Sequence, residues 1–448
     1  MKKILILGAG QSTPSLISYL LNEAKENNWF VTVCDMNLEL AKQRVNGHPN
    51  GIALEFDVND AAMRNKLIEE SDIVVNLLAP VFQYLIALDC LNFGKHCVTA
   101  SYENLRVAEL HKDAVRKGIL ILNEMGLDPG IDHMSAMALI NKIRENGGYV
   151  KSFISYGGGL PAPEVKSNPF NYCITWNPRN VVMAGESGAL YKEQGKQKVI
   201  SYQQVFNRTW EVDIEGVGTF EAYPNRDSLI YEKIFNVKKT ETMVRATLRY
   251  PGWGETWAQI VKLGLPTENF KIPNLHQKTY AEYIDMFLPL NISGTKIETK
   301  TANYLGISPT GKIMNNLRWL GLFSDEKIGG KVSTSAEVMT DLLRKKLPLP
   351  SGGRDLVILA HEVIAKYPKE KREEKIVSTL VEYGDPHGDT AIAKTVGLPA
   401  AIAAKLILQN KLPLNGCYIP THPSVYVPVM AELKKLGLKF KEKVQKIK

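Results

Sequence analysis

The stretch KKILILGAGQSTP, residues 2–14, decides the fold of this chain. A short apolar run leads into Gly8-Ala9-Gly10, and Thr13-Pro14 then offer an N-cap and a first helical residue. The first glycine permits a tight turn after a strand, and the second lets a pyrophosphate approach the backbone where the helix begins. Thr13 stands where a third glycine is usual, so the fingerprint is incomplete. The stretch predicts a strand, a turn and a helix that bind a dinucleotide, with a purely structural glycine turn as the alternative.

A carboxylate follows at the place where such a fold holds the adenosine ribose. Asp35 comes directly after the strand predicted over Val31–Cys34, 25 residues beyond Gly10. A carboxylate there accepts hydrogen bonds from the ribose hydroxyls and repels a 2′-phosphate. The residues that follow, Met36–Leu38, include no Arg or Lys, and the nearest following base is Lys42. The sequence therefore predicts NAD as the cofactor.

Strands and helices alternate over the first 125 residues. We predict strands over residues 4–7, 31–34, 73–77, 97–99 and 119–122, and helices over residues 15–27, 38–44, 83–92 and 105–117. This alternation is typical of a parallel sheet wrapped by helices. From residue 152 onward, β-branched and aromatic runs at 153–156, 209–214 and 242–250 predict a mixed or antiparallel sheet.

Helical spacing returns later in the chain. We predict helices over residues 256–265, 280–288, 313–321 and 336–345, and strands over residues 356–360 and 373–383. Residues 389–408 also have helical spacing, which Gly397-Leu398-Pro399 is expected to break. The fold class is therefore α/β, with a parallel sheet domain, a mixed α+β sheet domain and a small helical subdomain at residues 266–330.

Composition excludes several classes of protein. The chain has 448 residues, of which 44% are hydrophobic and 23% charged, as in ordinary folded proteins of two or three domains. The apolar run Ile4–Leu7 is too short for a signal peptide, and the apolar runs fall well below the ~20 residues of a membrane-spanning helix. We expect no membrane association. Five cysteines without CxxC spacing argue against zinc and a disulfide framework and favour the cytoplasm, and we expect no bound metal.

The formal net charge is +8, and part of the excess lies in a lysine-rich tail after residue 433. We interpret the tail as a solvated helix face, because it lacks the interleaved aromatic residues of a nucleic-acid patch. We expect no nucleic-acid partner. The excess is compatible with an anionic substrate.

The acid-rich block MGLDPGIDHM, residues 125–134, follows the strand predicted over 119–122. The carboxyl ends of parallel strands are where open α/β sheets hold ligands, so the block is a candidate site. The alternative is structural: Asp128 before Pro129-Gly130 is a good turn former, and His133 can be a core histidine with its hydrogen bonds satisfied. Spacing alone leaves both interpretations open.

Two arginines lie in comparable settings, Arg226 in YPNRDS and Arg249 in TLRYPG. Arginine is the side chain best suited to binding a carboxylate with two hydrogen bonds. The structural alternatives are a pairing of Arg226 with Asp227 and a solvated strand face for Arg249. Motifs of other chemistries are absent from the sequence: there is no GxSxG, no GxxxxGK[ST] and no HExxH. The segment GGGLPAP, residues 157–163, is predicted to be a shaped backbone turn.

Several segments spread over nearly the whole chain carry a family likeness. In chain order they are Thr99-Ala100-Ser101-Tyr102, MGLDPGIDHM from Met125, SYGGGLPAPE from Ser155, Asn168-Pro169-Phe170 with Trp176-Asn177-Pro178, YPNRDS from Tyr223, TLRYPG from Thr247, and AKTVGLP from Ala393. In these segments the chain resembles the glutamate-forming saccharopine dehydrogenases, also called saccharopine reductases. It is similar in particular to the dehydrogenase half of aminoadipic semialdehyde synthase.

The resemblance implies a fold in three parts. Residues 1–129 and 388–448 would form a Rossmann-like dinucleotide-binding domain. Residues 130–265 and 331–387 would bind substrate and form the contact of a homodimer, and residues 266–330 would form the helical subdomain.

The resemblance also implies an activity, the NAD-dependent oxidation of saccharopine to an imine that water splits into glutamate and 2-aminoadipate 6-semialdehyde, a reaction of lysine metabolism. It implies substrate contacts at Ser101, Tyr102, Asp128, Arg226, Thr247, Leu248 and Arg249. It implies cofactor contacts at Gly8, Gly10, Gln11, Ser12, Asp35, Met36, Asp57, Val58, Leu78, Ala100, Ser101, Leu127, Asp128, Pro129 and Asn177. Asp128 is the candidate catalytic residue, and either Asp128 or a solvent water can serve as the base.

Two other functions fit parts of the sequence. A reductase resembling carboxynorspermidine dehydrogenase would use the same cofactor domain and the same imine chemistry on a polyamine carboxylate. A dinucleotide sensor without turnover would keep the fold alone. Two arginines for several carboxylates favour saccharopine over the first, and the presence of Asp128 with both arginines argues against the second.

Overall fold

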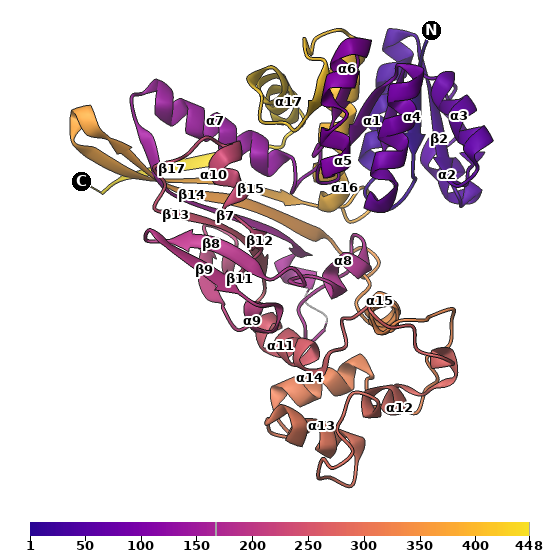
Figure 1. The fold of residues 1–448 in the computed structure, drawn as a ribbon, viewed down its shortest axis with the longest axis vertical. Coiled ribbons are helices and arrows are strands. Elements are labelled where there is room, and N and C mark those ends of the chain that lie inside the picture. Colours follow the sequence, from indigo (N-terminus) through magenta and orange to yellow (C-terminus); the bar gives the residue numbers. More distant parts are fainter. Residues whose placement is uncertain (166–167, 448) are drawn as a thin grey trace. The chain divides into compact units, whose positions relative to one another are not determined.

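The computed structural model describes residues 1–165 and 168–447. The chain forms two compact units, which we call the first unit (Met1–Val150 and Ile364–Lys448) and the second unit (Lys151–Val363). Figure 1 shows the elements of both units coloured along the sequence. The division into three domains with the boundaries given above stays a prediction.

The first unit is an α/β structure. Its strands and helices are β1 (Lys2–Leu7), α1 (Pro14–Asn27), β2 (Trp29–Asp35), α2 (Leu38–Val45), β3 (Gly51–Glu55), α3 (Ala61–Glu69), β4 (Ile73–Asn76), α4 (Gln83–Phe93), β5 (His96–Thr99), α5 (Leu105–Ala108), α6 (His111–Lys117), β6 (Leu120–Leu122), α7 (Ile131–Glu145), β15 (Arg372–Tyr383), α16 (Ala391–Leu408), β16 (Gly416–Tyr418), α17 (Pro423–Lys435) and β17 (Lys441–Lys446).

A parallel sheet organises the first unit, in the strand order β16-β6-β5-β4-β1-β2-β3. Neighbouring strands pair in parallel, and Leu7 at the end of β1 lies opposite both Cys34 of β2 and Asn76 of β4. The carboxyl ends therefore meet along one edge, which we call the carboxyl edge (residues 8–13, 35–37, 56–58, 77–79, 100–103 and 123–130). The chain order reverses between β1 and β4, and such a switch point is where open sheets of this kind bind ligands.

The predicted strands of this sheet are confirmed, and β3 and β16 are additions. Both extra strands are short edge strands, and β3 is only half buried, so neither shows a strong apolar run. The helix predicted over 105–117 is wrong in one respect, because it is divided into α5 and α6. The antiparallel pair β15 and β17 also belongs to the first unit.

The break expected at Gly397-Leu398-Pro399 is wrong, because helix α16 continues through these residues. A proline inside a helix costs ~3 kcal/mol or more, but most of this helix is buried, and packing outweighs the local penalty. Gly397 lets α16 approach α1 closely: a Cβ there would lie 3.0 Å from the Leu16 Cβ and 3.0 Å from the Ser12 carbonyl oxygen. The glycine therefore serves close helix packing beneath the first turn of α1.

Helix α16 is also long and apolar enough to cross a membrane by length and composition. In the structure 78% of that segment is buried, as in a core helix. Its apolar character is therefore explained by its contacts inside the first unit, among them the packing against α1.

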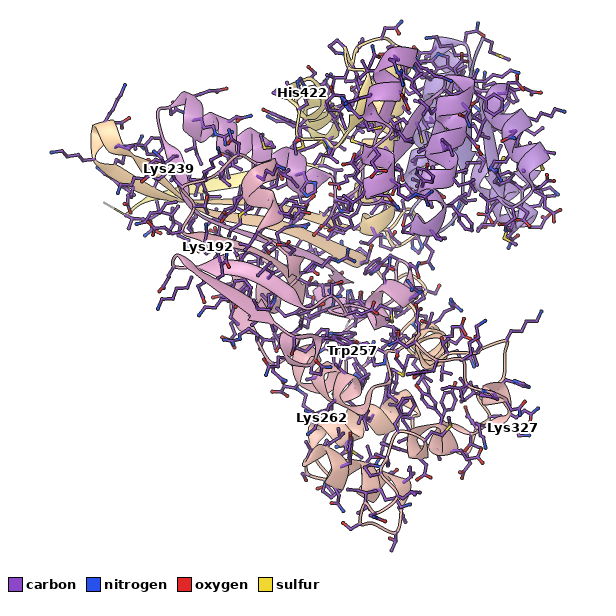
Figure 2. The ribbon with its side chains drawn as sticks, in the orientation of Figure 1. Lys192, Lys239, Trp257, Lys262, Lys327 and His422 are labelled. Carbon is purple, nitrogen blue, oxygen red and sulfur yellow. The ribbon has the colours of Figure 1, made fainter. Side chains whose placement is uncertain are left out.

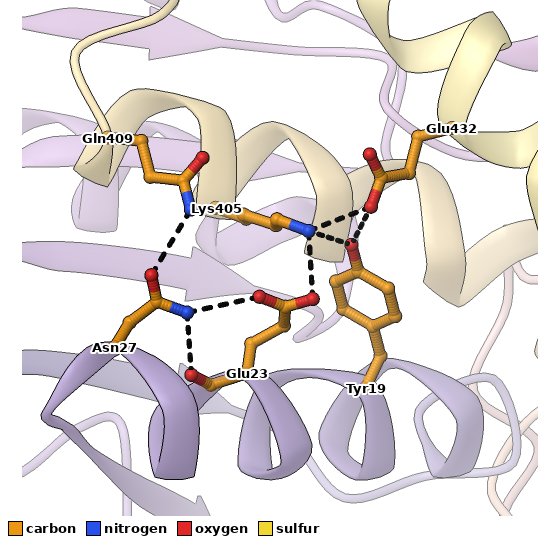
Figure 3. Close-up of polar contacts among 6 residues, drawn as sticks. All are labelled: Tyr19, Glu23, Asn27, Lys405, Gln409 and Glu432. Carbon is orange, nitrogen blue, oxygen red and sulfur yellow. Dashed lines mark hydrogen bonds and ion pairs between the residues drawn. The ribbon is translucent and has the colours of Figure 1, made fainter.

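A cluster of polar side chains, which we call the clamp (Tyr19, Glu23, Lys405 and Glu432), ties the C-terminal helices to α1 (Figure 3). The Lys405 Nζ lies 2.8 Å from the Glu23 Oε1 and 2.8 Å from the Glu432 Oε1, and Tyr19 donates to the same Glu432 oxygen at 2.6 Å. Burial alone would raise the pKa of Glu432, but the hydrogen bonds from Lys405 and Tyr19 hold it below its usual value. The clamp joins segments 382 residues apart.

The second unit combines a mixed sheet with helices. Its elements are β7 (Tyr149–Pro161), α8 (Pro178–Val182), β8 (Ala189–Glu193), β9 (Lys196–Ile200), α9 (Tyr202–Val205), β10 (Trp210–Ile214), β11 (Gly218–Pro224), β12 (Arg226–Asp227), α10 (Ile230–Ile234), β13 (Thr242–Arg249), α11 (Trp253–Leu263), α12 (Tyr280–Asp285), α13 (Ile297–Leu305), α14 (Lys312–Leu320), α15 (Ser335–Lys346) and β14 (Asp355–Tyr367).

Strand β13 lies inside the mixed sheet, antiparallel to β11 and parallel to β7. The glycine segment at 157–159 is part of β7, so the prediction of a backbone turn there is wrong. A Cβ on Gly158 would lie 2.9 Å from the Leu248 Cβ. The glycine therefore lets β7 and β13 pair closely, which explains a glycine inside a strand.

Candidate functional site

The glycine turn lies at the switch point of the parallel sheet. Gly8 has a φ of +104°, and a Cβ there would lie 3.1 Å from the Leu77 carbonyl oxygen. Gly10 has open space where a Cβ would project, so its backbone stays accessible. Thr13 is the N-cap residue of α1, but its hydroxyl donates to the Gly10 carbonyl at 2.8 Å and does not cap the helix. These features fit a bound pyrophosphate at the start of the helix.

Asp35 lies at the end of β2, as predicted, and its carboxylate contacts the glycine turn. Its Oδ2 accepts a hydrogen bond from the Ala9 N–H at 2.7 Å, and its Oδ1 accepts one from the Asn37 N–H at 2.8 Å. Each oxygen keeps capacity for a further donor, such as a ribose hydroxyl. The side chain of Met36 beside it is 72% exposed. The geometry fits the ribose of a dinucleotide.

Arg44 is a base near this turn that sequence reasoning missed. Its Nε donates to the Ala9 carbonyl oxygen at 3.3 Å, and burial lowers its pKa. No local motif marks this residue, because it reaches the turn from the last turn of α2. Lys42, the nearest base in the sequence, pairs with Glu39 instead, at 2.8 Å.

The remaining cofactor candidates of the first unit also lie on the carboxyl edge. Asp57 is exposed and accepts hydrogen bonds from the backbone and the side chain of Asn59 at 2.9 Å each. The carbonyl of Val58 accepts a hydrogen bond from Arg64 at 2.6 Å. The Leu78 N–H donates to the Asn76 Oδ1 at 3.1 Å. Gln11 is exposed and Ser12 half-buried in the turn before α1.

Two loops at the ends of β5 and β6 bring together predicted substrate residues. The Glu124 N–H donates to the Ser101 carbonyl at 3.1 Å, so the two loops lie side by side. The Tyr102 hydroxyl donates to the Asp128 Oδ1 at 2.9 Å. The structure thus joins Ser101, Tyr102 and Asp128 within one unit, together with the neighbouring cofactor candidates Ala100, Leu127 and Pro129.

The shape of the second loop depends on two glycines. Gly130 has a φ of +145°, and a Cβ there would lie 2.0 Å from the Gly126 carbonyl oxygen, which no side chain can satisfy. The Gly126 N–H donates to the Pro129 carbonyl at 3.0 Å and closes the turn. The turn places Asp128 on the surface, where the residue is exposed. The turn-forming and ligand-binding interpretations of this block are therefore compatible.

His133 is fully buried beneath these loops. Its Nδ1 lies 3.0 Å from the Glu124 Oε2 and its Nε2 lies 3.4 Å from the Asp132 Oδ2. It is a core histidine, as one of the two interpretations had it, but its neighbours are acidic. Glu124 is a further residue that sequence reasoning missed, although its place just before the block is a usable signal.

In the second unit, Arg249 ends β13 with only 4% of its surface exposed. Its Nη1 donates to the Leu248 carbonyl at 2.8 Å, and its guanidinium lies over the rings of Tyr172 and Trp253, 4.8 and 5.5 Å from their centroids. The Nε has no hydrogen-bond partner among the described residues. Trp253 stacks on Trp257, which Figure 2 labels in the interior of the unit. The solvated strand face considered for Arg249 is therefore wrong.

The other predicted residues of the second unit differ in burial. Arg226 is exposed in β12, with a φ of +53°. Thr247 pairs with Gly157 and Tyr223 in the sheet, and Leu248 is buried. The Asn177 Oδ1 accepts a hydrogen bond from the Arg179 N–H at 3.0 Å and caps α8. A cofactor contact for Asn177 stays a prediction.

Comparison with known families settles the relationship that these features suggest. The model of the saccharopine dehydrogenase C-terminal domain matches residues 126–438, and the model of the saccharopine dehydrogenase NADP binding domain matches residues 4–122. The chain belongs to the saccharopine dehydrogenase family. Its first unit therefore contains a domain that binds a nicotinamide dinucleotide.

Relatives of the saccharopine dehydrogenase family match the chain over almost its full length. One relative, from Schizosaccharomyces pombe, is 32% identical over 99% of both chains, and its name describes an L-glutamate-forming saccharopine dehydrogenase with NADP(+) as cofactor. The alpha-aminoadipic semialdehyde synthase of Arabidopsis thaliana is also 32% identical, and the chain spans 45% of its length. The apo L-Glu-forming saccharopine dehydrogenase of Saccharomyces cerevisiae has the same fold, with a TM-score of 0.87 and 31% identity over 99% of this chain and 100% of that one.

Proposed function

We propose that this protein is an NAD-dependent, L-glutamate-forming saccharopine dehydrogenase. The observation that carries the proposal is Arg249, a buried guanidinium with no carboxylate partner among the described residues and an unsatisfied Nε. Burying such a charge is unfavourable unless it is paired, so its natural partner is an anionic ligand. Membership of the saccharopine dehydrogenase family makes a carboxylate of saccharopine the candidate.

The chemistry of saccharopine suits the remaining candidates. Saccharopine has three carboxylates and two amines, so its site needs fixed cations and at least one acid. Arg249 and Arg226 would bind carboxylates, and Asp128 would bind an amine. The hydrogen bond from Tyr102 orients the Asp128 carboxylate.

The bound nicotinamide would accept a hydride from the lysine-side carbon, which leaves an imine between that carbon and the glutamate nitrogen. In the proposed reaction, Asp128 stabilises the amine before oxidation, and the amine proton passes to Asp128 or to water. Water then adds to the imine carbon and the carbon–nitrogen bond breaks. The nitrogen leaves as the amino group of L-glutamate, and the carbon becomes the aldehyde of 2-aminoadipate 6-semialdehyde.

The preference for NAD follows from Asp35. Its carboxylate lies at the glycine turn, and it would accept hydrogen bonds from the ribose hydroxyls of NAD. NADP would remove one of these donors and bring a like charge to the same place. The printed names of the fungal relatives give NADP(+) as their cofactor. The proposal therefore separates this chain from those relatives in cofactor choice.

Turnover assays test the proposal directly. The purified protein is given saccharopine, carboxynorspermidine or no substrate, each with NAD and with NADP, and the absorbance of the reduced nicotinamide is followed. We expect turnover with saccharopine and NAD, and formation of glutamate in equal amount. Turnover on carboxynorspermidine alone would support the polyamine reductase, and cofactor binding without turnover would support the dinucleotide sensor.

Two further proposals concern the state of the protein. All five cysteines are free thiols and buried, in keeping with a reducing compartment, and we propose a cytoplasmic location. A homodimer stays a prediction from the family resemblance. Cell fractionation tests the first and light scattering tests the second.

A further inference from the structure

A buried acidic cluster lies beneath the loops that carry Tyr102 and Asp128. We call it the loop cluster (Glu103, Glu124, Asp132 and His133). His133 is 0% exposed, Asp132 2% and Glu124 7%. Buried carboxylates are unfavourable unless hydrogen bonds or an opposite charge compensate them. The cluster therefore needs a physical reason for its place below the candidate site.

Two carboxylates of the cluster, Glu124 and Asp132, each hold one of the two loops. The Glu124 Oε1 accepts a hydrogen bond from the Glu103 N–H at 3.0 Å, directly after Tyr102 in the chain. The Asp132 Oδ1 accepts one from the Gly130 N–H at 2.7 Å, two residues after Asp128. Glu124 thus secures the first loop and Asp132 secures the second.

His133 lies between these two carboxylates, with its Nδ1 3.0 Å from Glu124 and its Nε2 3.4 Å from Asp132. A neutral imidazole has a single N–H, so it can donate to only one of them. The doubly protonated ring lies within ion-pair distance of both carboxylates, and its charge offsets one of the two buried negative charges.

We propose that His133, as an imidazolium, is a positioning residue that couples the two loops and so sets the geometry of the Tyr102–Asp128 pair. The inference rests on the proposed function, because that pair is assigned to the substrate amine. His133 does not touch the ligand in this arrangement. It acts through the two carboxylates and the backbone groups that they hold.

The charged groups around His133 are consistent with this role. Beyond Glu124 lies the carboxyl of Glu103, whose pKa is raised, first by burial and then by the charge of Glu124. The charge of His111 acts to lower the pKa of Glu103. The carboxyl groups of Glu124 and Asp132 beside His133 favour its protonated form.

His133→Gln tests the positioning role. The variant removes the positive charge and keeps a polar side chain of similar length. We expect kcat/KM for saccharopine to fall ~10- to 100-fold, the scale of a small misplacement of reacting groups, with the dissociation constant for NAD unchanged. Ile140→Val is the matched control, because it removes one methyl group from a fully buried residue of the same helix, and it should change neither quantity.

A double-mutant cycle with Tyr102→Phe separates positioning from general destabilisation. If His133 acts through the Tyr102–Asp128 pair, its replacement should have a much smaller effect once Tyr102 has lost its hydroxyl. Full additivity of the two effects would overturn the proposal. Unchanged kinetics in a folded His133→Gln protein would overturn it as well.

Nitrogen NMR of the imidazole rings gives a readout that does not depend on activity or on the folding of His133→Gln. We expect one imidazolium that keeps its proton at pH values well above ~6.5, the ordinary histidine pKa, and Glu124→Gln should lower the pKa of that ring. A neutral His133 at pH 7 would overturn the proposal. If the parent protein did not turn over saccharopine, the proposed function would be contradicted. The NMR result would still report the protonation state of His133.

Discussion

The carboxyl edge of the first unit and strand β13 of the second unit present charge in opposite ways. At the edge, Asp57 and Asp128 are exposed and Asp35 is half-buried, and hydrogen bonds from neighbouring groups hold all three. On β13, Arg249 is buried among aromatic rings. The carboxylates proposed to bind hydroxyls and amines thus lie near water, whereas the guanidinium proposed to bind a carboxylate is already desolvated. The free-energy penalty of lacking an oppositely charged partner is larger for a buried charge than for a charge in contact with water.

The largest effect should come from Arg249→Ala. Removing a buried charge partner typically costs ~2–5 kcal/mol of binding, so saccharopine affinity should fall by that amount. Arg226→Ala is the matched control, and it should cost less because that side chain is exposed. Titration calorimetry with saccharopine measures both, with NAD affinity as the internal reference. Equal losses in the two variants would remove the contrast between buried and exposed cations.

The second-largest effect should be on the preference between NAD and NADP. Asp35→Ser combined with Met36→Arg removes the like charge and adds a cation for the 2′-phosphate. Each hydrogen bond to a charged group is worth ~1.5–3 kcal/mol, so the ratio of kcat/KM between NAD and NADP should shift by about that much toward NADP. The parent is the reference. If the parent already used NADP as well as NAD, Asp35 would not contact the ribose as proposed.

Asp128→Asn should have a smaller effect. It keeps the size of the side chain and removes its charge, so kcat/KM for saccharopine should fall ~10-fold, equivalent to ~1.4 kcal/mol. The melting temperature should stay close to that of the parent, because the turn depends on Gly126 and Gly130. An unfolded variant would favour a purely turn-forming role, and unchanged kinetics would take Asp128 out of the site.

The smallest effect should appear in the clamp, which belongs to neither binding region. The pKa of Glu432 is lowered in the folded protein, so its contribution is present above the ordinary value of 4.5 and is lost as the pH falls through the folded value. Glu432→Gln should reduce stability by ~1 kcal/mol at pH 7 and by less at pH 4. Saccharopine affinity should not change. Thermal melts at both pH values measure this.

Glu39→Gln is the control for the clamp. Glu39 pairs with Lys42, but its side chain is 79% exposed, so the variant should have no measurable effect on the melting temperature at either pH. A loss equal to that of Glu432→Gln would mean that burial does not distinguish the two ion pairs.

The sequence predicted those features that depend on local chemistry. The glycine turn, the strand before it and the position of Asp35 follow from residue types at short spacing, because a tight turn and a helix start need particular residues. The parallel sheet followed from the alternation of strand and helix patterns. The position of MGLDPGIDHM after a strand was also predicted, since the block lies two residues beyond a short apolar run, but the helix α7 that begins within it was not.

Only the tertiary structure decided the features that depend on packing between distant segments. It kept α16 helical through Pro399, because burial outweighs the local penalty. It buried Arg249, whose pattern was also compatible with a solvated face. It placed Glu124 and Asp132 around His133 and brought Arg44 to the glycine turn. Residue type determines what a side chain can bind, but its burial and its neighbours are set by contacts that no local pattern encodes.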